Sequence, residues 1–160
     1  MNTNRQHGFS LIELLIVVAI IGIIAAIAIP NLLASRRAAN EGSAQQTIRT
    51  IHSSEATYQS TGGNGNFGDF ATLRAGSLID SVLAGGTKSG YTFAITKVDL
   101  VVNVSPAVFF VTSVPLVTSG VSQTGTRRFA MADDGVMHGD TTLSVPADRA
   151  AVDAMTALGN

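Results

Sequence analysis

The chain has 160 residues, of which 46% are hydrophobic and only 13% are charged, and its formal net charge is −1. Such a chain has no basic electrostatic footprint for a phosphate backbone, so composition argues against nucleic-acid binding and no nucleic-acid partner is predicted. Cysteine is absent, which excludes a disulfide framework, so the fold must rest on its core, on subunit packing or on a metal.

An unbroken apolar run from Leu14 to Ile29 follows the segment Gly8-Phe9-Ser10-Leu11-Ile12-Glu13 near the start of the chain. As a helix, residues 9–29 would span about 30 Å, which is enough to cross the hydrocarbon core of a bilayer. A charged side chain at the centre of such a helix costs about 2.5–3.5 kcal/mol, and less near its end. Glu13 is therefore predicted to be functional, with a partner for its charge.

Three interpretations fit an N-terminal segment of this kind. A secretory signal peptide would use Arg5 as its basic start and Ala26-Ile27-Ala28 as its cleavage site, but Glu13 lies inside the apolar stretch. A plain membrane anchor needs only the length and the apolar composition. The third interpretation is a short polar leader that is cleaved before Phe9 and leaves the apolar helix attached.

The segment from Gly8 to Leu15, with Pro30 further along, closely resembles the N-terminus of type IV pilins and related pseudopilins. In that family a membrane-embedded peptidase cleaves after the glycine and methylates the new N-terminus. The resemblance implies that Gly8 ends a leader of residues 1–8 and that Phe9 becomes the N-methylated first residue. It also implies that Glu13 guides each subunit into a growing filament.

The chemistry of Glu13 agrees with such a role. Cleavage would give Phe9 an amine that titrates near pH ~8 and is largely protonated at neutral pH. Glu13 lies one helical turn away, and the amine of its own chain or of an adjacent subunit is a possible partner. An unpaired carboxylate is costly in a low-dielectric site, whereas a well-paired one is tolerated. The alternative is a carboxylate in the interfacial zone that reaches water on the cytoplasmic side.

Charge counting does not orient the segment, because Arg5 precedes the apolar run while Arg36 and Arg37 follow it. The family resemblance implies that the leader lies inside the cell and the C-terminal region outside. The expected location is the bacterial inner membrane for the precursor. After assembly it is an extracellular filament or a periplasmic pseudopilus.

The helix is expected to continue to residue 61, because Ala44, Ile48, Ile51 and Tyr58 recur at helical spacing and no proline follows residue 30 in this stretch. Glu55 interrupts this apolar stripe.

Two residues are predicted to bend or loosen this helix. Pro30 removes a backbone donor, and Gly42 weakens the helix interior. Arg37 and Glu41 have the spacing of an ion pair along one helix.

The remaining residues, 62–160, are predicted to form a β-rich globular region that opens with a glycine-rich loop at residues 62–66. Alternation around Phe93 predicts a half-buried strand, and residues 107–114 are apolar on both faces, as in a central strand. Asp134-Gly135 predicts a hairpin between residues 128–132 and 136–138.

Three further segments complete the expected fold. A short helix is expected near residues 78–83, and residues 98–104 fit either a strand or an apolar loop. A terminal helix is expected to start at Ser144-Val145-Pro146 and to end at Gly159. The predicted class is α+β, with a long N-terminal helix packed on a small antiparallel sheet, similar to pilins.

No motif for catalysis or for a cofactor stands out, so neither an enzyme nor a cofactor is predicted. Residues 85–89 lack the spacing of a phosphate-binding loop and fit a turn better. Asp133, Asp134 and Asp140 are weak candidates for a calcium site, because carboxylates suit hard cations. Solvated turn residues are the favoured alternative, so no metal is predicted.

The sequence therefore predicts three parts: a leader of residues 1–8, a helix of residues 9–61 with residues 9–29 as its membrane or filament-core half, and a globular region of residues 62–160. The favoured function is a structural subunit of a filament like a type IV pilus, whose partners are other copies of itself, the inner membrane, prepilin peptidase and the assembly machinery. The alternatives are a pseudopilin of a type II secretion system and a membrane-anchored periplasmic binding domain.

Overall fold

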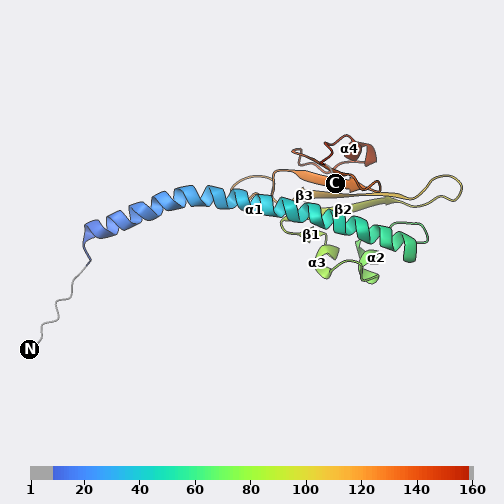
Figure 1. Ribbon diagram of the computed structural model, residues 1–160, viewed down its shortest axis with the longest axis horizontal. Helices are drawn as coiled ribbons and strands as arrows, with labels where there is room; N and C mark the ends of the chain where they lie inside the picture. The colour runs from blue at the N-terminus through green and yellow to red at the C-terminus, as the bar shows by residue number, and fades with distance from the viewer. Residues whose placement is uncertain (1–8, 159–160) are drawn as a thin grey trace, which may run out of the picture. The chain divides into compact units, whose positions relative to one another are not determined.

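The computed structural model describes residues 9–158 and has an α+β architecture (Figure 1). Its helices are α1 (Leu11–Thr61), α2 (Phe70–Ala75), α3 (Ser81–Ala84) and α4 (Arg149–Asp153). Its strands are β1 (Thr87–Lys88), β2 (Tyr91–Val98), β3 (Val108–Pro115), β4 (Arg128–Ala132) and β5 (Met137–Asp140). The predicted class, a long N-terminal helix with a small antiparallel sheet, is confirmed.

The chain divides into two compact units, of which the first ends at Ser35 and the second begins at Arg36. Among the described residues, the first unit contains only the start of α1 and the two residues before it. The second unit contains the remainder of α1, the whole sheet and the short helices.

The sheet is an antiparallel meander in which each strand pairs with its neighbours in sequence, in the order β1-β2-β3-β4-β5. The predicted central strand is β3, where Val111 pairs with Ile95 on one side and with Met131 on the other. Such neighbours need only short connections. The hairpin between β4 and β5 turns at Asp134-Gly135 as predicted, and Gly135 has a φ of 76°, which favours glycine.

Helices cover both faces of this sheet within the second unit (Figure 1). Successive strand residues point to opposite faces, so Phe110 and Val111 belong to different cores. On one face, the predicted stripe of α1 is buried against the sheet; this core includes Ala44, Ile48, Ile51, Phe93, Val111, Phe129 and Met131. On the other face, residues of the α4 region pack on β3 and β4; this core contains Phe110, Ala130, Ala132, Val152 and Met155.

The predicted terminal helix is wrong in its extent, because α4 covers only Arg149–Asp153. The Asp148 side chain accepts a hydrogen bond from the Ala151 N–H at 2.8 Å and so sets the start of the helix. Beyond α4 the chain joins the edge of the sheet, where the Leu158 N–H donates to the Met137 carbonyl at 2.8 Å. Residues that pair with β5 cannot remain helical, and the predicted end at Gly159 lies outside the described residues.

Two connecting segments, residues 67–84 and residues 98–105, also differ in detail from the predicted elements. Helix α2 was not predicted; it begins with a capping box between Asp69 and Thr72. The helix expected near residues 78–83 is the shorter α3. Residues 98–104, which fitted a strand or a loop, divide between the end of β2 and a tight turn closed by a bridge between Val101 and Ser105.

A carboxylate lies in the middle of the core. Glu55 is fully buried on α1, and its Oε2 accepts a hydrogen bond from the Gly68 N–H at 2.7 Å. Its other oxygen, Oε1, is buried without a hydrogen-bond partner. Burial raises the pKa of Glu55 to about 7, although the Gly68 N–H opposes this shift. The interruption in the apolar stripe is therefore a buried acid rather than an exposed position.

Replacing the buried acid by its neutral isostere, Glu55→Gln, is expected to stabilise the protein at pH 8 and to have little effect at pH 5. The pKa of this carboxyl is near its ordinary value of 4.5 in the unfolded chain and about 7 in the folded protein. The folded state therefore binds the proton more tightly, and stability falls as the pH rises through this window, by about 1–3 kcal/mol. Urea unfolding of the full chain in detergent across this pH range measures the difference.

Glu41→Gln is the matched control on the same helix. The pKa of Glu41 is lowered in the folded protein, so its charge stabilises the fold above the unfolded pKa, and that contribution is lost as the pH falls through the folded pKa. The control should therefore destabilise the protein at neutral pH. Parallel pH profiles for wild type and Glu55→Gln would contradict the proposed ionisation of Glu55.

Candidate assembly site

The part of α1 in the first unit presents an exposed apolar surface. Its large apolar side chains are about half exposed or more; they include Leu11, Ile12, Leu14, Leu15, Ile16, Val17, Val18, Ile20, Ile21, Ile23, Ile24, Ile27 and Ile29. Consecutive helix residues point in all directions, so the helix is apolar all round. Among the described residues, α1 alone is long and apolar enough to cross a membrane, judged by length and composition.

Glu13 lies in the first turn of α1 and caps the helix. Its Oε2 accepts a hydrogen bond from the Ser10 backbone N–H at 2.8 Å, while the Ser10 carbonyl accepts the Leu14 N–H at 3.2 Å. A glutamate in this position satisfies a free backbone donor and places negative charge at the positive end of the helix dipole. The Ser-x-x-Glu spacing was the signal for this capping role, which adds to the predicted assembly role.

Of the two residues at the predicted cleavage point, the structure describes Phe9 but not Gly8. Phe9 is the first described residue, and its side chain is 85% exposed. Gly8 and the remainder of the leader lie outside the described residues. Cleavage after Gly8 and N-methylation of Phe9 stay predictions.

The two predicted weak points, Pro30 and Gly42, both lie inside α1, which is helical through each of them. Pro30 has no N–H, so the Ala26 carbonyl loses its usual helix partner. A Cβ atom added at Gly42 would meet nothing within 4 Å. No contact therefore requires glycine at position 42, and its role as a point of helix flexibility stays a prediction.

Glu41 links α1 to the connection between β3 and β4 through hydrogen bonds. Its Oε1 accepts hydrogen bonds from the Thr126 N–H at 2.8 Å and hydroxyl at 2.7 Å, and its Oε2 accepts one from the Arg127 Nε at 2.9 Å. The predicted ion pair with Arg37 is wrong, because tertiary packing turns Glu41 toward Arg127 instead. Burial raises the pKa of Glu41, but the bonds from Thr126 and Arg127 outweigh it and hold the pKa below its usual value.

The three weak candidates for a metal site each face an arginine of the same chain. Asp133 and Asp134 both pair with Arg149, and Asp140 makes a bidentate pair with Arg128 at 2.8 Å through both oxygens. The described residues contain no group of three or more histidine, cysteine or carboxylate side chains that could hold a metal ion. The arginines supply the positive charge that these carboxylates need.

Residues 3–29 match the family model described as the prokaryotic N-terminal methylation motif. The class indicated by the apolar helix and its acidic first turn is therefore that of proteins with this motif, and the predicted resemblance is confirmed for the N-terminal segment.

The individual relatives are pilus and secretion proteins. The type IV major pilin protein PilA of Myxococcus xanthus is 40% identical over 67 residues, or 42% of this chain and 30% of that protein. The type IV wide pilus major component PilA4 of Thermus thermophilus is 65% identical over 37 residues, or 23% and 28% of the two chains. The type II secretion system core protein G of Escherichia coli is 32% identical over 57 residues, or 36% and 39%.

Each match spans less than half of the relative's length. The solved structures contain no significant match to this chain.

Filling the open position with Gly42→Ala is expected to raise the free energy of unfolding by about 0.5–1 kcal/mol, because alanine has a lower entropic cost within a helix. The reverse change at an exposed neighbour, Ala39→Gly, should lower stability by a similar amount. Chemical unfolding in detergent measures both variants. A loss of stability in Gly42→Ala would show that the position needs a conformation that only glycine provides.

Proposed function

We propose that this protein is a structural subunit of an extracellular filament like a type IV pilus, processed from a precursor and assembled through the first half of α1. The observation that carries the proposal is an all-apolar, uncovered helix that bears the N-terminal methylation motif and one carboxylate in its first turn. The proposed role is structural rather than enzymatic.

The apolar helix needs an environment that removes it from water. Burial of apolar surface contributes roughly 25 cal/mol per Å², so a helix of this kind is stable in a bilayer or in a bundle of similar helices. We place the precursor in the bacterial inner membrane and the assembled subunit in a filament whose core is a bundle of these helices. Its partners are then other copies of the chain, prepilin peptidase and the assembly machinery.

Glu13 sets the position of each helix along the bundle relative to its neighbours. Cleavage before Phe9 would leave a protonated amine close to the start of α1, where Glu13 already accepts the Ser10 N–H. Entry of the helix into an apolar bundle raises the cost of an unpaired carboxylate, and the amine of a neighbouring subunit relieves that cost. The Glu13 carboxylate and the neighbour's Phe9 amine meet only when the entering helix has the correct position along the bundle axis.

A second candidate function is a pseudopilin of a type II secretion system. It is favoured by the match to the type II secretion system core protein G described above. Both candidates use the same helix and the same processing, so they are distinguished by whether the assembled filament extends outside the cell. Immunogold labelling of intact cells discriminates them, because a pilus is labelled outside the cell and a pseudopilus is not.

Processing is the direct test of the proposal. The protein recovered from sheared filaments should consist of residues 9–160 with one added methyl group on the Phe9 amine, as measured by intact-mass and N-terminal peptide spectrometry. Gly8→Leu should leave the uncleaved precursor in the membrane, because the peptidase must fit the residue before the cut. A mature N-terminus after Ala28, or an intact Met1, would overturn the proposal in favour of a signal peptide or a plain anchor.

The two roles of Glu13 separate in a pair of variants. Glu13→Gln keeps an acceptor for the Ser10 N–H but removes the charge, whereas Glu13→Ala removes both. If charge pairing drives assembly, both variants should lose at least about tenfold in filament yield at matched levels of processed subunit. If capping alone matters, Glu13→Gln should assemble like wild type, and that result would refute the charge-pairing role.

A further inference from the structure

The second unit has two chemically different ends. At the end that we call distal, β2 finishes at Val98 and β3 begins at Val108, and the β4–β5 hairpin turns at Asp134-Gly135. At the opposite end, which we call proximal, Tyr91 pairs with Pro115, and the β3–β4 connection lies beside Glu41. Helix α1 therefore runs from the proximal to the distal end within this unit.

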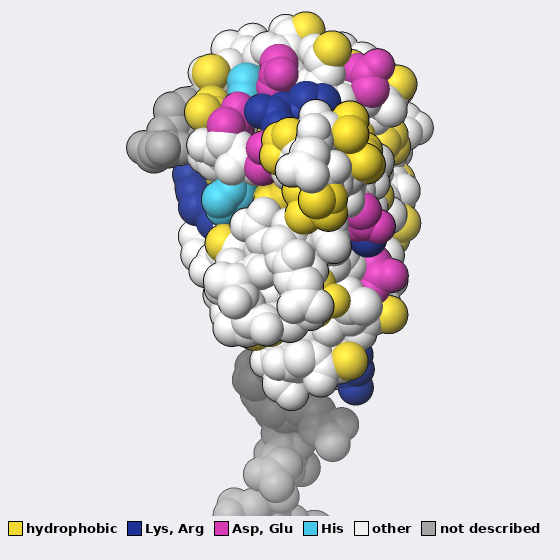
Figure 2. Space-filling model, turned by 90° about the vertical axis from the view of Figure 1, so that its right-hand side faces the viewer, with side chains coloured by type: hydrophobic (Ala, Val, Ile, Leu, Met, Phe, Trp, Pro, Cys, Tyr) yellow, Lys and Arg dark blue, Asp and Glu magenta, His cyan; other side chains and the backbone are white. Residues whose placement is uncertain are grey.

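An apolar knob, residues 98–105, projects from the distal end. Val102 and Val104 are 73% and 79% exposed, and Val98, Leu100 and Val101 are exposed as well. The knob is ordered by its own backbone: Val101 and Ser105 exchange hydrogen bonds of 3.0 Å in both directions. Figure 2 faces this end and shows hydrophobic side chains gathered at its middle among charged ones. A preformed cluster of exposed valines indicates an interaction surface.

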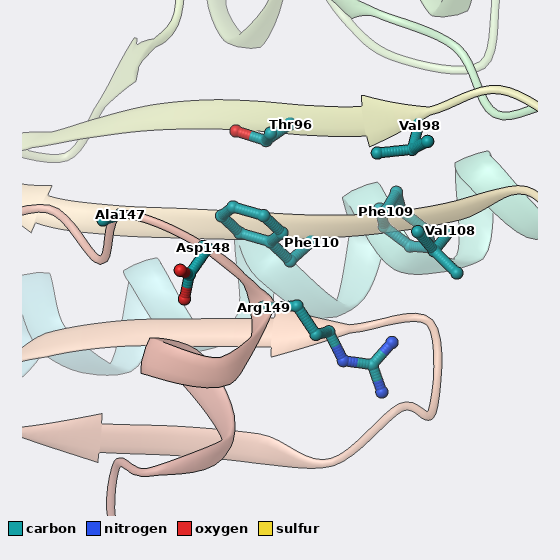
Figure 3. A pocket seen from close by; sticks show the side chains of 8 residues that line it. All are labelled: Thr96, Val98, Val108, Phe109, Phe110, Ala147, Asp148 and Arg149. Atoms are coloured by element: carbon teal, nitrogen blue, oxygen red, sulfur yellow. The ribbon is translucent and has the colours of Figure 1, made fainter.

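A shallow apolar groove of about 270 Å³ continues the knob onto the sheet (Figure 3). Val98 belongs to both features; beside it lie Val108 and Phe110 from β3, with Arg149 and Asp148 on the opposite side. Helix α4 packs on β3 and β4 and leaves this part of β2 uncovered. The distal end thus offers one apolar surface with a charged border.

The proximal end carries its own exposed apolar residues on the β3–β4 connection. Leu116 and Val121 are 60% and 73% exposed. This connection is also ordered, because the Thr124 N–H donates to the Val117 carbonyl at 3.0 Å and Asn40 donates to the Thr124 carbonyl at 2.9 Å.

The charges of the two ends are complementary. At the distal end carboxylates outnumber basic side chains: Asp69, Asp99, Asp133, Asp134, Asp148 and Asp153 stand against Arg49, Arg74, Lys97 and Arg149. At the proximal end basic side chains prevail: Arg36, Arg37, Lys88, Arg127 and Arg128 stand against Glu41, Asp80 and Asp140. Arg36 and Arg37 take part in none of the ion pairs among residues 9–158, and Arg37 Nε is buried without a hydrogen-bond partner.

We propose that the distal knob of one copy packs against the β3–β4 connection at the proximal end of a second copy, in a head-to-tail contact. Two distal ends would bring like charges together, whereas a distal and a proximal end join opposite charges. A contact between two different surfaces does not close on itself and therefore builds an open filament. This inference rests on the proposed filament function and assigns the surfaces through which the globular units adhere.

The absence of native cysteine allows a direct test in filaments. The full chain carrying Val102→Cys and Val121→Cys is assembled in cells, and sheared filaments are treated with a short bis-maleimide. Denaturing gels should show a ladder of multimers for this double variant and only monomers for each single variant. Val82→Cys with Val121→Cys is the control pair, because Val82 is also 60% exposed but lies on α3.

A second measurement uses the same positions. Val102→Lys should lower filament yield by about tenfold or more, since it places a positive charge in an apolar contact that faces the basic proximal end, while processing and the thermal midpoint of the unassembled subunit stay unchanged. Val82→Lys should assemble like wild type.

The possible outcomes separate this inference from the proposed function. A ladder in the Val102/Val121 pair alone supports the head-to-tail contact. Dimers in the Val102→Cys single variant would show a symmetric contact and overturn it. Filaments of the Val102/Val121 double variant that form in normal yield without a ladder, together with normal assembly of Val102→Lys, would overturn this inference but leave the filament function standing. Wild-type chains that never form filaments would overturn the proposed function and this contact with it.

Discussion

An apolar helix segment whose large side chains are exposed is the constraint on which everything else in this protein depends. From Leu11 to Ile29 the large side chains face outward on all sides, and the sheet and short helices belong to the other compact unit. The hydrophobic effect makes prolonged contact of this surface with water unfavourable, so the helix requires a membrane or other helices. The globular unit is then a folded domain attached to a segment whose stability depends on partners.

Three glutamates along α1 show how one helix meets three environments. Glu13 lies in the first turn of the helix, where its Oε2 accepts a hydrogen bond from the Ser10 N–H. Glu41 is buried at the contact with the sheet, and Thr126 and Arg127 satisfy both of its oxygens. Glu55 is buried deeper with a single donor, and its pKa rises to about 7 instead. Donors on both oxygens of Glu41 outweigh its burial, whereas burial of Glu55 outweighs its single donor.

The meander sheet gives the globular unit a polarity that suits repetition. Because each strand pairs with its sequence neighbour, alternate connections emerge at opposite ends of the sheet. The connection after β2 is apolar and lies among carboxylates, whereas the connection after β3 lies among arginines. A chain built in this way presents different surfaces at its two ends, as open-ended assembly requires.

Local patterns in the sequence determined the long helix, its end at the glycine-rich segment, the β4–β5 hairpin and the resemblance around Gly8, Phe9 and Glu13, because each depends on residues close in the chain. The two-sided apolar character of β3 likewise predicted its central place. What only the tertiary structure decided involves distant partners: Glu41 binds Arg127 rather than Arg37, Glu55 is enclosed beside Gly68, and α4 ends early because the following residues pair with β5. Helical spacing indicates which residues share a face of the helix, but it does not indicate which hydrogen-bond donors from distant parts of the sequence will contact that face.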